Sequence, residues 1–164
     1  MNISNGSVYL MVGDLYFGDD VDEIKTLLGS CVAITLWHPR LKHGGMSHII
    51  LPEADPSSTD DPNDTRYAGG AVHAFMKKIT GFGMKPSQYQ VGLYGGGRMF
   101  ATGDAKTMMD VGMRNVRMTR SLLEQHGFKV DQEDAGGEFY RHVHLNLHTG
   151  DVNVRATPVS KTMG

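Results

Sequence analysis

The fold of this chain is decided by residues 28–52, which read LGSCVAITLWHPRLKHGGMSHIILP. The segment from Val32 to Trp37 is apolar and rich in β-branched residues, so it is predicted to be a β-strand. The run His38-Pro39-Arg40 breaks this strand, and residues Met46 to Leu51 are predicted to form the strand that returns alongside it. An antiparallel hairpin is therefore expected, with glycines close to both strands.

This hairpin can bring a thiol and an imidazole together. A turn centred between Pro39 and Arg40 would place Cys31 directly opposite His48, where cross-strand side chains meet. A turn centred later, near Lys42, would instead put Cys31 opposite a residue beyond His48. The spacing permits the pair and leaves both registers open.

The composition indicates a globular protein without a nucleic-acid or membrane function. The chain has 164 residues, 40% hydrophobic and 21% charged, with a formal net charge of −2, which suits one domain over residues 1–164 and provides no basic field for nucleic acid. Its single cysteine cannot form an internal disulfide, which favours a reducing compartment. The N-terminus lacks the features of a signal peptide, and no apolar run approaches the ~20 residues of a membrane span, so the cytoplasm is the expected location.

The rest of the chain alternates predicted strands, helices and loops. Further strands are expected at 8–12, 24–28, 90–94, from 128 onward, at 139–148 and at 152–154, with loops at 17–23 and 53–64. One helix should begin with Asp64 or Thr65 as its N-cap, end near Thr80, and bury an apolar face made of Tyr67, Ala71, Val72, Phe75, Met76 and Ile79. A second helix is predicted from Asp110 to His126, burying Val111, Val116, Met118, Leu122 and Leu123.

Cys31 is the strongest candidate for a catalytic residue. A lone cysteine is most often a small, inert core residue, but Gly29 and Ser30 place this one at the junction of a loop and a strand, where it can be reached. The imidazole of His48 can take the thiol proton and hold the thiolate as an ion pair. A third group usually orients such an imidazole; Thr26 is the best nearby candidate, and Ser30, Ser47 and Thr35 compete with it.

Two other patterns have weaker functional interpretations. His142, His144 and His148 share one face of a predicted strand, but they extend too far along it for all three to bind one ion, so a solvated polar face is preferred to a metal site. The run Gly95-Gly96-Gly97 lacks the Lys-Ser or Lys-Thr ending of a P-loop. It could let the backbone approach a substrate, supply N–H donors to an oxyanion, or simply end a strand with a turn.

Together these residues resemble the CheD family, the chemoreceptor glutamine deamidases of bacterial chemotaxis. The resemblance is carried by the Cys31 and His48 segments and by further motifs in the family order: Arg66-Tyr67, Gly95-Gly96-Gly97, Gly112-Met113-Arg114-Asn115, Asp134-Ala135-Gly136-Gly137 and Thr149-Gly150-Asp151-Val152. It implies an α+β fold in which β-sheets pack as a sandwich with two or three helices alongside. It also implies that Cys31 is the nucleophile, that His48 is the general base and acid, and that Thr26 orients the imidazole.

The resemblance also implies a reaction and its partners. The Cys31 thiolate would attack the carboxamide of a receptor glutamine and form a thioester, which water would hydrolyse to glutamate. Substrate and oxyanion are expected close to Gly29, Ser30, Ser47, Gly95 and Gly96. Neither a cofactor nor a metal is implied; the expected partners are chemoreceptor helices and a phosphatase of the CheC type, bound by the same face. Two alternatives remain open, a binding module with weak or no deamidation and a thiol hydrolase of small amides or esters.

Overall fold

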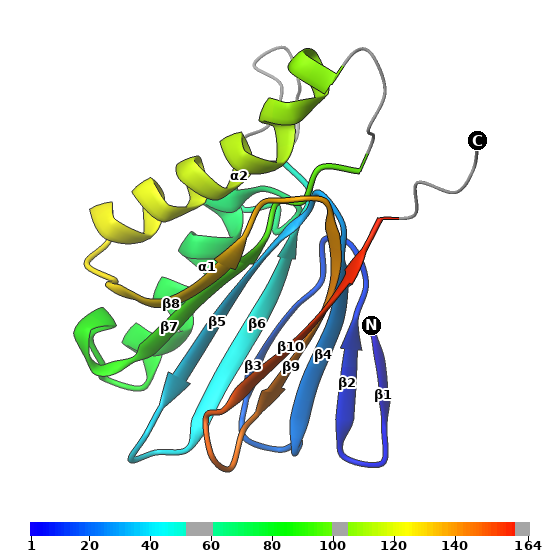
Figure 1. Ribbon diagram of the computed structural model, residues 1–164. Coiled ribbons are helices and arrows are strands. Elements are labelled where there is room, and N and C mark those ends of the chain that lie inside the picture. The colour runs from blue at the N-terminus through cyan, green and yellow to red at the C-terminus, as the bar shows by residue number, and fades with distance from the viewer. Residues whose placement is uncertain (52–60, 100–104, 160–164) are drawn as a thin grey trace.

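Two five-stranded β-sheets pack face to face, and two helices cover the outer face of one of them (Figure 1). The computed structural model describes residues 1–51, 61–99 and 105–159, and for residues 105–110 it describes the backbone alone. This α+β sandwich confirms the predicted fold class. No helix in the described part of the chain is long and apolar enough to cross a membrane.

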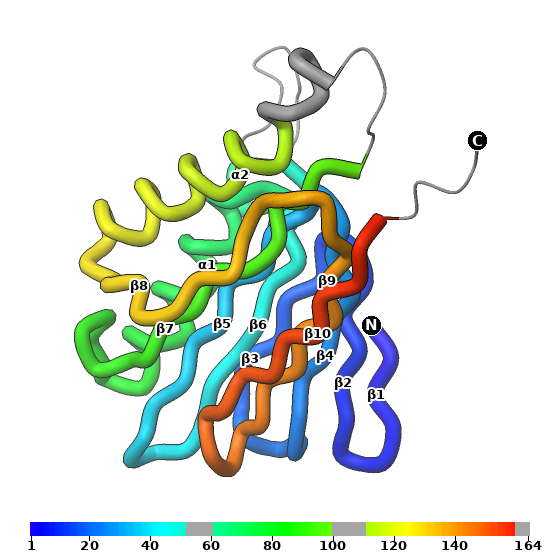
Figure 2. The backbone as a smooth tube through the Cα atoms, in the orientation of Figure 1, coloured from blue at the N-terminus to red at the C-terminus, as the bar shows by residue number. Residues whose placement is uncertain are grey.

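The two sheets are mixed, with strands far apart in sequence lying side by side. The first sheet has the strand order β1 (Asn2–Ser4), β2 (Ser7–Leu10), β4 (Glu23–Leu28), β9 (Phe139–Asn146) and β10 (Val152–Pro158). The second has the order β3 (Leu15–Gly18), β6 (His43–Ile49), β5 (Val32–His38), β7 (Gln90–Gly95) and β8 (Val130–Ala135). The helices are α1 (Ala68–Gly81), a short 3₁₀ helix η1 (Pro86–Gln88) and α2 (Ala105–Gln125). The tube in Figure 2 shows the chain passing directly from β4 into β5, and therefore from one sheet to the other.

The second sheet is covered on both faces, which explains why its central strand is mostly apolar and fully buried. Every residue of β5 and β6 is buried. On one face, Ile34 and Leu36 pack with Phe75 of α1 and Leu123 of α2. On the other face, Ala33 and Trp37 pack against the first sheet, in a core with Leu10, Ile24, Met46, Val143 and Leu145. Strands that are buried on both faces lose the usual alternation of apolar and polar residues.

Helix α1 confirms the predicted apolar face, but it begins later than expected. Ala71, Phe75 and Ile79 are fully buried, whereas the N-cap residue is Tyr67. Asp64 cannot cap the helix because its carboxylate binds the backbone and guanidinium of Arg66. Thr65 is also unavailable, since its hydroxyl donates to the carbonyl of Gly13.

Helix α2 begins at Ala105 instead of Asp110, and its apolar face was predicted only in part. Val116 and Leu123 are buried as expected, but Val111 is 43% exposed. Gly127, at a φ of +92°, follows the helix end. The sequence prediction also missed two short strands, β1 and β3, because each has four residues or fewer and lacks a clear alternation.

The β5–β6 hairpin has a later turn than the one that would pair Cys31 with His48. His38 pairs with His43, and Ala33 pairs with His48. Lys42 adopts a φ of +52° and closes the four-residue turn by donating its N–H to the His38 carbonyl. The His38 imidazole accepts the N–H groups of Arg40 and Leu41 and so fixes this turn. Of the two registers that the sequence leaves open, the structure has the later one, and Cys31 lies two residues before the cross-strand partner of His48.

Candidate active site

Cys31 lies on a turn at the end of the sandwich that is uppermost in Figure 1, where β4 ends and β5 begins. Its side chain is half-buried and packs against the core between the two sheets. The turn is held from behind by β7: the Gly96 N–H donates to the Cys31 carbonyl and the Gly97 N–H to the Gly29 carbonyl, each at 2.9 Å. The thiol is thus carried on a fixed backbone beside the inter-sheet core.

His48 projects into the same inter-sheet region from β6. It is only 4% exposed, and its pairing with Ala33 places both side chains on the face toward the first sheet. Its backbone is held on both sides by the β2–β3 turn, because Gly13 donates to the His48 carbonyl at 2.8 Å and the His48 N–H donates to the Asp14 carbonyl at 3.1 Å. Since Cys31 is two residues before Ala33 on the neighbouring strand, it is a diagonal neighbour of His48.

Thr26 joins His48 across the gap between the sheets. Thr26 lies on β4, is 1% exposed, and its Oγ1 is 2.7 Å from His48 Nδ1. The single hydroxyl proton of Thr26 is donated to the Leu10 carbonyl at 2.9 Å. The hydroxyl oxygen must therefore accept a hydrogen bond from Nδ1–H, which leaves Nε2 of the neutral ring unprotonated. This tautomer can accept a proton from a thiol.

Burial keeps both the imidazole and the thiol neutral. Desolvation lowers the pKa of His48 to about 4, against a smaller opposing effect of the Asp14 carboxylate. Desolvation also raises the pKa of the Cys31 thiol. Both shifts favour a neutral thiol and a neutral imidazole over an ion pair of the two. Among the described residues, Cys31 Sγ makes no hydrogen bond to His48, and such contacts often tighten only when substrate binds.

Two of the three competing hydroxyl candidates, Ser47 and Thr35, have other partners. Ser47 is next to His48 on β6, so strand alternation turns it to the opposite face, where its Oγ accepts the Ile34 N–H at 3.4 Å. Its expected place beside the substrate is therefore wrong. Thr35 shares a hydrogen bond with Tyr94 farther along β5. Ser30 is next to Cys31 on the turn and is half-buried.

The triple-glycine run supports the Cys31 turn. A Cβ built on Gly95, which has a φ of +111°, would lie 2.2 Å from the Cys31 carbonyl oxygen. Because Gly96 and Gly97 donate their N–H groups to the turn, these amides are engaged and are not available to an oxyanion. The glycines therefore allow a close approach, but the group that approaches them is the backbone of the Cys31 turn and not a substrate.

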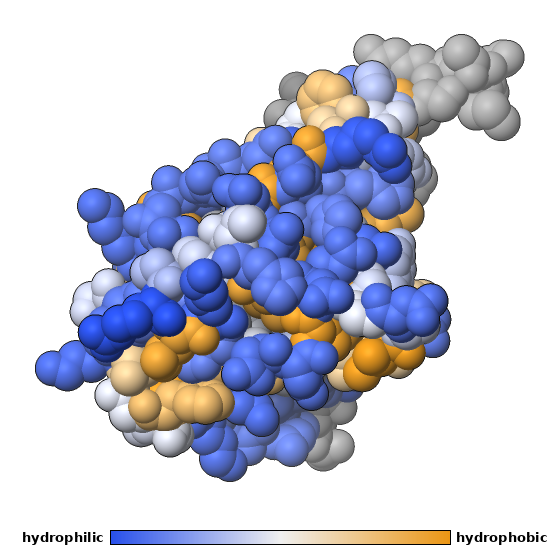
Figure 3. Space-filling model, turned by 90° about the horizontal axis from the view of Figure 1, so that it is seen from below, coloured by the Kyte–Doolittle hydropathy of each residue, from blue (hydrophilic) through white to orange (hydrophobic). Residues whose placement is uncertain are grey.

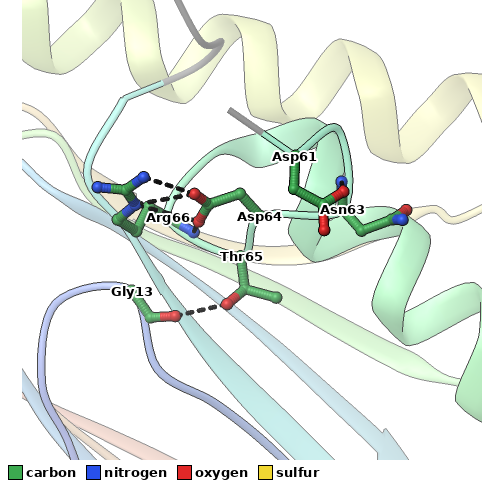
Figure 4. A network of polar contacts seen from close by, with 6 residues as sticks. All are labelled: Gly13, Asp61, Asn63, Asp64, Thr65 and Arg66. Atoms are coloured by element: carbon green, nitrogen blue, oxygen red, sulfur yellow. Dashed lines mark hydrogen bonds and ion pairs between the residues drawn. The ribbon is translucent and has the colours of Figure 1, made fainter. Parts of the chain in front are cut away.

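Residues 61–66 lie beside the loop that holds His48 (Figure 4). Thr65 Oγ1 donates to the Gly13 carbonyl at 2.6 Å, and Gly13 in turn donates to His48. Arg66 forms an ion pair of 2.6 Å with Asp64 and lies over the Tyr67 ring at 5.4 Å. Gly13 and Asp14 were missed by the sequence reasoning, although both residue types are common in turns.

The three histidines at 142, 144 and 148 point away from this site. His144 contacts Glu23, and His148 Nε2 lies 2.7 Å from Asp22 Oδ1. The two imidazoles therefore contact two different carboxylates of the first sheet and its turns. Within the described ranges, no group of three or more His, Cys, Asp or Glu side chains is arranged to hold a metal ion.

Comparison with known proteins identifies the family of the chain. The family described as "CheD chemotactic sensory transduction" matches residues 50–156. The chain is 40% identical to "Probable chemoreceptor glutamine deamidase CheD 3" of Dechloromonas aromatica, over 88% of this chain and 84% of that one. It is 38% identical to CheD 1 of Leptospira interrogans over 90% of both chains, and 38% identical to CheD of Pseudomonas savastanoi over 93% of this chain and 85% of that one.

Among solved structures, the chain is similar to Bacillus licheniformis hypothetical protein YfiH, with a TM-score of 0.45 and 13% identity over 74% of this chain and 49% of that one. This likeness is too weak to assign a fold or a role. The curated relatives cover most of the chain at 38–40% identity, and together with the family match they establish the family. The chain belongs to the CheD family.

Proposed function

We propose that this protein deamidates glutamine side chains of chemoreceptors in the cytoplasm, converting them to glutamate with release of ammonia. The relatives named chemoreceptor glutamine deamidases support the reaction and its substrate class. The observation that carries the mechanism is the Thr26–His48 hydrogen bond of 2.7 Å, because it leaves the second imidazole nitrogen free to accept a proton. The alternative of a hydrolase for small amides has no such support from the relatives.

The proposed reaction uses Cys31 and His48 in two stages. The thiol proton passes from Cys31 to His48 Nε2 as sulfur attacks the carboxamide carbon. The imidazolium then protonates the departing amine, ammonia leaves, and an acyl thioester on Cys31 remains. In the second stage His48 takes a proton from water, hydroxide attacks the thioester, and the imidazolium returns its proton to the departing Cys31 sulfur. Backbone N–H groups of the Ser30–Cys31 turn are the proposed oxyanion donors.

Thr26 is proposed to hold the imidazole through both stages. It is a neutral partner, so it orients the ring without stabilising the imidazolium as strongly as a carboxylate would. The low pKa of His48 matches this role, because a neutral imidazole is the form that accepts the thiol proton at neutral pH. No cofactor or metal takes part in the proposed steps.

A second candidate function is that of a binding module which regulates receptors or a phosphatase of the CheC type. Exposed apolar side chains around the Cys31 turn favour a protein partner, and they include Met11, Val12, Ile50, Leu51, Phe139 and Tyr140. Tyr140 lies directly beside Gly29, since a Cβ built there would be 3.7 Å from its ring. The opposite end of the sandwich is mostly hydrophilic, with small apolar patches (Figure 3). The exposed apolar side chains around the Cys31 turn suit a protein substrate as well as a regulatory partner.

Mass spectrometry of a receptor fragment separates the two functions. The cytoplasmic part of a chemoreceptor is incubated with the protein or with its Cys31→Ala variant, and glutamine-to-glutamate conversion is mapped by peptide. Conversion by the unmutated protein alone supports the deamidase. Cys31→Ala should keep its fold, because removing one half-buried sulfur is a small change in volume. Equal binding with no conversion by either protein would overturn the deamidase in favour of the binding module.

A further inference from the structure

We propose that Arg141 is a positioning residue that fixes the Cys31 turn from the opposite sheet. The inference rests on the proposed role of Cys31. Arg141 lies on β9 of the first sheet, and its cross-strand partner is Leu28, the last residue before the Cys31 turn. It interrupts an otherwise apolar inward face, yet its side chain is only 4% exposed. A buried guanidinium is costly unless it is fully engaged, so its contacts identify its role.

The guanidinium joins three acceptors that come from two other segments. Nη1 donates to the Gly95 carbonyl at 3.3 Å, and Nη2 donates to the Gly136 carbonyl at 2.7 Å. Nε donates to Asp134 Oδ1 at 3.0 Å, which pairs the buried charge. Because Asp134 lies near the end of β8, Gly136 directly follows β8 and Gly95 ends β7, one side chain of the first sheet ties together two strand ends of the second.

Gly95 connects this arrangement to the nucleophile. Its carbonyl accepts both from Arg141 and from the Gly136 N–H at 2.9 Å. The next residue, Gly96, donates to the Cys31 carbonyl, and Gly97 donates to Gly29. The Cys31 turn is therefore two hydrogen-bonding steps from the guanidinium. Loss of Arg141 would remove the guanidinium donor from the Gly136 carbonyl and one of the two donors from the Gly95 carbonyl, and it would allow the glycine run, and with it the thiol, to shift.

The charge alone does not explain these contacts; the planar fork of arginine does. Lysine offers one nitrogen and cannot reach three acceptors that lie in different directions. Arg141→Lys keeps the charge beside Asp134 but loses the fork, and Arg141→Met loses both. Asp134→Asn keeps the fork and removes only the paired charge. Arg155→Met, an exposed arginine on the neighbouring strand β10, is a matched control.

The test combines kinetics with a measurement that needs no substrate. For each variant, the melting temperature is recorded first, and all rates are then measured where the variant is fully folded. Deamidation of a receptor fragment gives kcat and KM, and alkylation of Cys31 by iodoacetamide gives a rate as a function of pH. For Arg141→Lys we expect kcat to fall roughly 10- to 100-fold with KM changed by less than about threefold, because misplacement of a reacting group affects the chemical step. The pH profile of alkylation should shift as well.

Several outcomes distinguish the possibilities. Unchanged kcat and an unchanged alkylation profile in folded Arg141→Lys, with only a lower melting temperature, would overturn the positioning role. If Arg141→Lys does not fold, Asp134→Asn is the decisive variant, because it removes the carboxylate that anchors Nε, so the guanidinium should shift on its two carbonyl acceptors and the alkylation profile should change. An unchanged profile in folded Asp134→Asn would contradict the proposal. If the unmutated protein deamidates nothing, the proposed function fails, and the alkylation profiles still decide whether Arg141 holds the thiol. Equal effects of Arg155→Met would also contradict the proposal.

Discussion

Thr26 and His48 belong to different sheets, and their side chains meet at 2.7 Å inside the sandwich. Thr26 lies five residues before Cys31 in the sequence, on the strand that leads directly into the Cys31 turn. One short segment therefore supplies both the thiol and the group that orients the imidazole. The packing of the two sheets is what completes the site.

Replacement of Thr26 by valine should impair turnover through the imidazole tautomer. Valine has the same shape but no hydroxyl, so His48 Nδ1 and the Leu10 carbonyl both lose their partner. We expect kcat to fall roughly 10- to 100-fold and unfolding to become easier by about 1–3 kcal/mol. Steady-state kinetics and urea unfolding measure the two effects, and ¹⁵N shifts of the imidazole report the tautomer.

The controls for this prediction separate stability from mechanism. Thr26→Ser keeps the hydroxyl and should retain most of the activity. Thr119 is a fully buried threonine on α2 whose hydroxyl contacts Asn115 at 3.3 Å. Thr119→Val should therefore lower stability without changing kcat or the tautomer. A Thr26→Val variant as active as the unmutated protein would rule out an orienting role.

Asp14 should tune the basicity of His48. Its carboxylate raises the pKa of the imidazole and so opposes part of the lowering by burial. Asp14→Asn removes this negative charge, while the amide oxygen can still accept the Met11 N–H. The pKa of His48 should then fall further below about 4. An NMR titration of the His48 Cε1–H signal measures the change.

Asp151→Asn is the control for Asp14→Asn, since Asp151 is exposed and lies on the turn between β9 and β10 at the other end of the sandwich. It should leave the titration of His48 unchanged. An equal shift in both variants, or a rise in the His48 pKa in Asp14→Asn, would show that the Asp14 carboxylate does not act on this imidazole.

The sequence predicted the central elements well because their signals are local. The apolar run over β5, the apolar residues that follow Gly44-Gly45 within β6 and the 3.6-residue pattern of α1 each contain the information for their own structure. The predicted positions of Cys31, Thr26 and His48 as close neighbours in one hairpin and its flanking strand also follow from short separations in the sequence. The resemblance to the CheD family added the architecture as a whole.

The features that sequence reasoning missed depend on contacts between distant segments. The sequence left two hairpin registers open, and the structure has the later turn, in which the His38 imidazole accepts two backbone N–H groups, a contact that composition does not reveal. Arg141 read as an interruption of an apolar face, since its acceptors on Gly95 and Gly136 lie on the other sheet. Asp14 acts on His48 only because β3 pairs with β6.

Acid should destabilise the protein through its buried histidines. Burial lowers the pKa of His48 to about 4, and it also lowers the pKa of His38 and of His43, which face each other. In the unfolded chain these groups bind protons near pH 6.5, so as the pH falls below that value the unfolded state takes up protons that the native state excludes. The histidines therefore do not reduce the free energy of unfolding above pH 6.5, and they reduce it progressively as the pH falls toward 4. For His48 alone the loss amounts to about 3 kcal/mol.

Urea unfolding at pH 7 and at pH 4.5 measures this effect, and His48→Gln isolates one histidine, since glutamine cannot titrate. The fall in unfolding free energy between the two pH values should be smaller in His48→Gln than in the unmutated protein. Carboxyl groups titrate in the same range, but they contribute equally to both proteins. An identical fall in the two would mean that His48 titrates normally in the native state.

Gly95→Ala should displace the Cys31 turn. The added Cβ would lie 2.2 Å from the Cys31 carbonyl oxygen, and the φ of +111° is unfavourable for alanine. Because the clash is with backbone, the turn must move, and we expect a lower melting temperature together with a changed rate of Cys31 alkylation in the folded protein.

Gly69→Ala is the matched control: Gly69 lies in α1 with nothing within 4 Å of the added Cβ. It should leave alkylation unchanged and stabilise the helix by about 0.5–1 kcal/mol. Alkylation and melting temperature that are unaltered in Gly95→Ala would show that the glycine run does not hold the thiol in place.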